Sequence, residues 1–96
     1  MVELVSLQTF DGSWKWTVNL FSSLGVEEEK LKAVLAGLEE TVMATLLAVA
    51  FLESKVPEEE GVWEMIVEKA KGWLVGKTGE SSAVDGLTKV KEQVFG

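Results

Sequence analysis

The segment from residue 41 to residue 54 constrains the fold most, because it leaves almost no polar face on a helix. A helix that is apolar on nearly every side must be covered by other parts of the protein. The segment is too short to cross a bilayer, which takes about 20 apolar residues. Pro57 ends it, because the residue before a proline avoids the α-helical region. We therefore expect a central, buried helix at about 41–54. Its apolar residues are Val42, Met43, Leu46, Leu47, Val49, Ala50, Phe51 and Leu52.

Shorter helical segments are expected before this central helix. A short apolar turn covers residues 2–8, and a helix over 17–24 is followed by Gly25, a residue type that commonly ends helices. The next helix begins with the acidic run 27–29, which is favourable at the positive end of the helix dipole. Its apolar stripe consists of Leu31, Val34, Leu35 and Leu38.

Two further helices are expected after Pro57. The acidic run 58–60 begins the first of them, and we expect a loop over 76–79 to end it. Its apolar stripe consists of Val62, Trp63, Ile66, Val67, Ala70, Trp73 and Leu74. Ser81 or Ser82 is expected to cap the last helix. The stripe of that helix consists of Val84, Leu87, Val90 (or the aliphatic stem of Lys91) and Val94.

Together these segments predict an all-α fold. We expect a compact bundle of five or six short helices around the central helix at about 41–54. The chain has 96 residues, a length at which proteins form one domain. We therefore assign residues 1–96 to a single helical domain. The apolar content of 47% is that of a globular protein rather than a disordered one.

The chemistry of the chain is limited by four missing residue types. The sequence contains no histidine, cysteine, tyrosine or arginine. The commonest general base and the best thiol nucleophile are therefore missing, as are the usual ligands of zinc, haem and iron–sulfur clusters. We therefore expect no enzymatic activity, no metal and no cofactor. Such a composition is typical of a binding module.

The charge of the chain excludes two classes of partner. The formal net charge is −7 at pH 7, so the basic footprint of a nucleic-acid-binding protein is absent. Anionic membrane surfaces repel such a chain for the same reason. The N-terminus lacks the basic region of a signal peptide, so we expect the cytoplasm as the location. Another protein is then the expected partner.

The segment 10–16 holds the candidate binding residues. Asp11 and Gly12 form a turn signal, and the alternation of Trp14 and Trp16 with polar residues fits a short extended segment. The structural interpretation is a turn that buries Trp14 and lets Gln8 or Asp11 bond to the backbone. The functional interpretation is a recognition groove, because tryptophans are favoured interface anchors. The candidate binding residues are Phe10, Asp11, Trp14, Trp16 and Trp73.

Four segments in a fixed order carry a family resemblance. They are LVSLQ at 4–8 with DGSW at 11–14, ATLLAVAFL at 44–52, WE at 63–64 and KAKGWL at 69–74. Together they resemble the C-terminal helical region of proteins that carry a VIT module and a von Willebrand factor A domain. The related region of the vault poly(ADP-ribose) polymerase binds the major vault protein. The resemblance implies an interaction domain cut from the C-terminus of a larger protein, with a vault-type particle as one partner.

Two other functions are kept as alternatives. The chain could be a structural or homo-oligomerisation cap without a separate ligand, self-associating through its amphipathic last helix. It could also be an enzyme that uses two carboxylates, such as Asp11 and a glutamate, on a sugar. That enzyme needs two carboxyl groups about 5–10 Å apart across a cleft.

Overall fold

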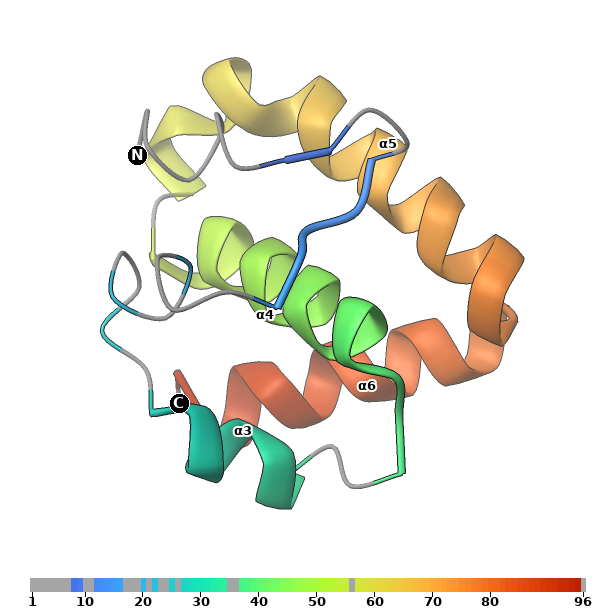
Figure 1. Ribbon diagram of the computed structural model, residues 1–96. Coiled ribbons are helices and arrows are strands. Elements are labelled where there is room, and N and C mark those ends of the chain that lie inside the picture. Colours follow the sequence, from blue (N-terminus) through green and yellow to red (C-terminus); the bar gives the residue numbers. More distant parts are fainter. Residues whose placement is uncertain are drawn as a thin grey trace.

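The fold is organised around the apolar helix α4, Glu40–Lys55. The computed structural model describes residues 8–9, 12–16, 20, 22, 25, 27–34, 37–55 and 57–95. Helix α4 lies in the middle of the molecule, and α3, α5 and α6 all pack against it (Figure 1). Ten of its residues are buried, including Leu46, Leu47 and Val49. A buried helix at the expected position is therefore confirmed, with ends one residue beyond the predicted ones.

The other helices follow α4 around the core. Helix α3 covers Glu28–Val34, and a 3-10 turn, η1, covers Pro57–Glu59. Helix α5 covers Glu60–Thr78, and α6 covers Glu80–Gln93. An isolated antiparallel bridge joins Gln8 to Trp14. The all-α class is confirmed, but a total of five or six helices is not, because within the described residues the structure gives the bounds of four α-helices.

The N-terminal expectations are only partly covered by the structure. Residues 2–7 lie outside the described residues, and of the expected helix at 17–24 the structure describes Leu20 and Ser22, both helical. Leu20 is fully buried. The described part of α3 covers Glu28–Val34, Leu35 of the predicted stripe lies outside the described residues, and the inclusion of Leu38 was wrong. Gly37 follows with a φ of 93°, and Leu38 lies outside the helix and is exposed.

The expected loop over 76–79 is wrong, because α5 continues through Gly76 to Thr78. Glycine within a helix lowers the stability of that helix by about 1 kcal/mol relative to alanine. Gly76 lies on the exposed face of α5, whereas Leu74 is buried. The packing of the buried face therefore stabilises the helix beyond Gly76. Only Gly79, with a φ of 90°, separates α5 from α6. The two helices meet there and diverge on either side of α4 (Figure 1).

The buried face of α6 also differs from the predicted one. Its buried residues are Ala83, Gly86, Leu87 and Val90, whereas Val84 is 58% exposed. The helix is thus rotated about its axis relative to the predicted orientation. Gly86 explains this difference, because it faces α4 so closely that a Cβ atom there would lie 2.8 Å from Leu46 Cδ1. The predicted serine cap is wrong too, because Gly79 precedes the helix and no side chain caps it.

One polar side chain in α4 connects this helix to the N-terminal turn. Thr45 is fully buried. Its Oγ1 accepts a hydrogen bond from Trp14 N at 3.0 Å and donates one to Thr41 O at 2.8 Å. Trp14 is also fully buried, so this bond holds the turn against the middle of the core.

We expect Thr45→Val to lower the free energy of unfolding by roughly 1–3 kcal/mol, because a buried donor loses this acceptor. Urea denaturation followed by circular dichroism measures the loss. Thr88→Val is the matched control, because Thr88 Oγ1 bonds to Val84 O in the same way but is exposed. We expect a change within about 0.5 kcal/mol for the control. Equal losses in the two variants would contradict a structural role for the Thr45 bond.

Candidate functional site

The N-terminal turn is bonded to α5 as well as to α4. Gln8 Nε2 donates hydrogen bonds to Gly12 O at 3.0 Å and to Ile66 O at 3.1 Å. Gly12 has a φ of 99°, and a Cβ atom at this position would lie 2.9 Å from Lys69 O. Glycine is therefore required here both for the backbone conformation and for the close approach of α5. The turn is a fixed part of the core, as its structural interpretation predicted for Gln8 and Trp14.

The predicted binding residues take different positions. Trp14 is fully buried, so its side chain offers no surface to a partner in this conformation. Phe10 and Asp11 lie outside the described residues, and their binding role stays a prediction. Trp16 and Trp73 are half-buried. These two tryptophans are the predicted residues whose positions leave them open to a partner.

Trp16 forms a polar corner with α3. Its Nε1 donates a hydrogen bond to Glu28 Oε1 at 2.9 Å. Lys32 Nζ lies 3.3 Å from the same carboxylate oxygen and 5.7 Å from the centre of the Trp16 ring. The hydrogen bond from Trp16, and then the one from Lys32, hold the pKa of Glu28 below its ordinary value. The accessible part of Trp16 is thus already paired with a cation and a carboxylate.

Trp73 lies on α5 and has a different lysine beside its ring. Lys77 Nζ lies 5.7 Å from the centre of the Trp73 ring, a distance at which a cation is attracted to an aromatic face. Trp16, in contrast, is held by α3. The contacts of the two side chains therefore do not define a common aromatic groove.

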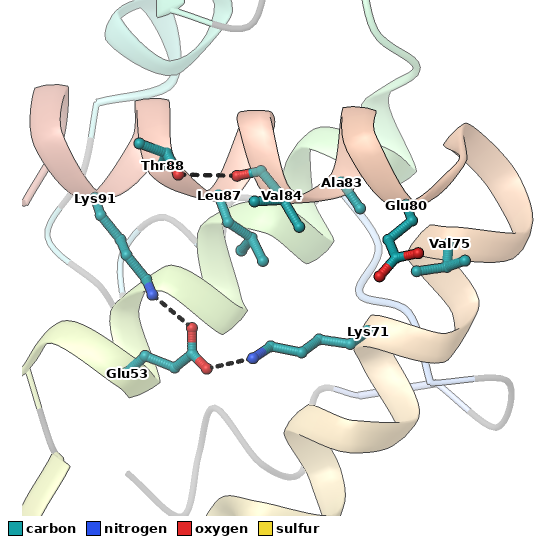
Figure 2. Close-up of a pocket in the computed structure, with 9 residues that line it drawn as sticks. All are labelled: Glu53, Lys71, Val75, Glu80, Ala83, Val84, Leu87, Thr88 and Lys91. Carbon is teal, nitrogen blue, oxygen red and sulfur yellow. Dashed lines mark hydrogen bonds and ion pairs between the residues drawn. The ribbon is translucent and has the colours of Figure 1, made fainter.

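A hollow between α4, α5 and α6 is the better candidate site. It has a volume of about 410 Å³. Figure 2 shows the side chains around it, with those of α6 along one side, Glu53 of α4 on another and Lys71 and Val75 of α5 completing it. Val75 and Val84 are 43% and 58% exposed. The complete lining is Glu53, Lys71, Val75, Glu80, Ala83, Val84, Leu87, Thr88 and Lys91.

One carboxylate at the edge of the hollow joins three helices. Lys71 Nζ of α5 lies 2.7 Å from Glu53 Oε2, and Lys91 Nζ of α6 lies 2.8 Å from Glu53 Oε1 (Figure 2). Burial alone would raise the pKa of Glu53, but the two ammonium groups outweigh it and hold the pKa below the ordinary 4.5. The carboxylate is therefore ionised at neutral pH, and the three groups together carry a net charge of one positive unit.

This arrangement suits binding better than acid–base chemistry. A carboxyl group that acts as a general acid needs a raised pKa, and the pKa of Glu53 is lowered. The described part of the chain has no cluster of three residues able to hold a metal ion. Within the same residues, no helix is long and apolar enough to span a membrane. The hollow combines apolar walls with ammonium groups at one edge.

The sequence did not indicate this hollow. It depends on the rotation of α6 that Gly86 permits, which turns Val84 outward, and on helix α5 continuing to Thr78. The signal that could have found it is Gly86 itself, since an isolated glycine in a helical pattern often marks close packing. If Gly86 is taken as a point of contact with another helix, Ala83 and Leu87 are predicted to face the core.

Comparison with known proteins matches this chain to a segment of much longer proteins. The protein is homologous to a segment of von Willebrand factor A domain-containing proteins. It is 32% identical over its whole length to von Willebrand factor A domain-containing protein 5A of Mus musculus, of which it covers 13%. The proteins of that name from Rattus norvegicus and Homo sapiens are 32% and 29% identical over 85% and 98% of this chain.

The chain spans between 10% and 13% of the length of these relatives. No family model and no solved structure matches it. The resemblance to von Willebrand factor A type proteins, which rested on segments within about 2–75, is thus confirmed, and the homology extends over the whole chain. The VIT module, the C-terminal position and the relation to the vault polymerase stay predictions.

We expect Glu53→Gln to lower the free energy of unfolding at pH 7 by roughly 1–2 kcal/mol, a value between those of exposed and buried charged pairs. The contribution of Glu53 is complete above its ordinary pKa of 4.5 and is lost as the pH falls through the lower pKa of the folded state. The difference between the native chain and the variant should therefore shrink below pH 4.5 in urea titrations.

Asp85→Asn is the control for this prediction. Asp85 is exposed and pairs with Lys89 one turn away at 3.3 Å, a type of pair that contributes about 0.3–0.5 kcal/mol. A Glu53→Gln effect that is no larger than that of the control would show that Glu53 does not hold the three helices together.

We expect Gly12→Ala to destabilise the protein more than Gly37→Ala. Both residues have a positive φ, of 99° and 93°, so each variant loses about 1–3 kcal/mol through backbone strain. The added Cβ at Gly12 also presses on the backbone of Lys69, whereas nothing lies within 4 Å at Gly37. Thermal unfolding of the two variants gives the comparison. Equal midpoints would mean that the turn can move away from α5.

Proposed function

We propose that this chain is a non-catalytic protein–protein interaction region of a von Willebrand factor A type multidomain protein. The observation that carries the proposal is the hollow between α4, α5 and α6. Val75 and Val84 are exposed there, beside the two lysines that pair with Glu53. Exposed apolar side chains next to a concavity are a common feature of protein-binding surfaces.

The sequence supports the class of partner. The net charge of −7 disfavours nucleic acids and anionic membranes. We place the protein in the cytoplasm, and we take the vault particle as the first partner to test, because that partner follows from the family resemblance. The homology to a small part of a much longer protein agrees with a region through which the longer protein binds another protein.

The test is binding of the isolated chain to purified vault particles by co-sedimentation, with capture from a cell lysate and mass spectrometry in parallel. We expect Val84→Glu to weaken binding about tenfold, equivalent to 1.4 kcal/mol, because it places a charge on the apolar wall of the hollow. Met65→Glu is the control, because Met65 is 82% exposed on α5 but does not line the hollow.

Trp16→Ala tests the other exposed aromatic position. Binding that is lost in Trp16→Ala and unchanged in Val84→Glu would move the interface to the corner between Trp16 and α3. If neither vault particles nor any lysate protein binds the native chain above background, the role in binding a different protein is wrong.

A further inference from the structure

The face of α6 that borders the hollow has opposite charges at its two ends. Glu80 begins the helix and is exposed, and Lys91 lies near its end with 40% of its side chain exposed. Eleven residues correspond to about three turns, so the two side chains lie on the same face roughly 16 Å apart along the axis. Val84 and Thr88 lie between them and are both exposed.

This pattern is complementary to itself when the helix direction is reversed. In an antiparallel pair of α6 helices centred between Val84 and Leu87, Glu80 of one chain meets the end of the other helix that carries Lys91. A twofold axis makes every contact occur twice, so both charged pairs form at once. Among the residues that the structure describes, Glu80 has no ion-pair partner of its own.

The surface beside α6 is complementary in shape as well. Val84 stands at the border of two hollows, the one in Figure 2 and a second lined by Glu80, Ser81, Val84, Asp85 and Thr88. The first has an apolar wall formed by Val75, Ala83 and Leu87. A protruding valine next to an apolar hollow can enter the hollow of a second copy while receiving that copy's valine.

We propose that this face binds a second copy of the chain, with α6 antiparallel to the partner's α6. Glu80 pairs with the partner's Lys91, and Val84 enters the partner's hollow. Lys91 can serve both carboxylates, because an ammonium group has three donors and its contact with Glu53 Oε1 uses one side of it. The inference rests on the proposed interaction role of the hollow and names its occupant.

The dimer is expected to be weak and to depend on concentration. The hollow is lined by nine residues, whereas a standard stable interface involves roughly 20–30 residues on each side. Each chain also carries a net charge of −7, which opposes association. Close reciprocal charge pairs can nevertheless select one orientation, because a like-charge contact in the wrong register costs several kcal/mol.

The experiment is sedimentation velocity of the purified 96-residue chain from micromolar to millimolar concentration. We expect a reversible monomer–dimer equilibrium for the native chain. Glu80→Lys and Val84→Glu should each weaken it about tenfold or more. Met65→Glu adds the same charge as Val84→Glu outside this face and should leave the equilibrium unchanged.

A mixture of charge-reversal variants tests the register. Glu80→Lys and Lys91→Glu should each be monomeric, because each places like charges together, whereas their equimolar mixture should form a heterodimer. Circular dichroism checks that Lys91→Glu is folded, since it also loses the bond to Glu53. If it is not folded, Glu80→Lys and Val84→Glu decide the question.

Two outcomes overturn the dimer: a native chain that stays monomeric at millimolar concentration, or a dimer that both Glu80→Lys and Val84→Glu leave unchanged. A monomeric chain that still captures another protein through Val84 leaves the proposed function in place and assigns the hollow to that protein. A dimer that captures nothing supports the inference and removes the role for a different partner.

Discussion

The burial of α4 is the constraint on which the rest of the structure depends. A helix without a polar face has to be covered from several sides, and α3, α5 and α6 supply that cover. Thr45 is the polar exception within the buried part of α4, and its hydroxyl is used to hold Trp14 of the N-terminal turn. The turn is thereby part of the cover over α4, which explains why so short a segment is fixed in place.

Close packing at two glycines and the partly buried carboxylate of Glu53 set the positions of the segments that cover α4. Gly86 lets α6 approach Leu46, and Gly12 lets the turn approach Lys69. Glu53 then connects α4 to both α5 and α6 through its two lysines. Because α5 and α6 diverge from the single residue Gly79, side chains do not fill the space near their junction, and the hollow of Figure 2 is the result.

The sequence predicted the features that follow from local chemistry and missed those that follow from contacts between helices. The central helix, the acidic start after Pro57 and the turn at Gly12 were visible, because hydrophobic period, proline and glycine are local signals. The orientation of α6 was not, because hydrophobicity alone favours a stripe through Val84 over one through Ala83, whereas the close contact of Gly86 with Leu46 turns Ala83 inward. The predicted site relied on tryptophans as interface anchors, but a tryptophan is equally suited to a core, and Trp14 is used there. Ion pairs such as Glu53 with Lys71 join residues that are distant in the sequence and have no local signature.

The distribution of the four tryptophans has a spectroscopic consequence. The chain contains no tyrosine, so its near-ultraviolet emission comes from tryptophan with only a minor phenylalanine background. Trp14 and Trp63 are buried, whereas Trp16 and Trp73 are half-buried and lie next to lysine ammonium groups. Emission should therefore contain a blue-shifted component that water-soluble quenchers do not reach and a second component that they do. The first reports on the integrity of the core and the second on events around Trp16 and Trp73, without any attached label.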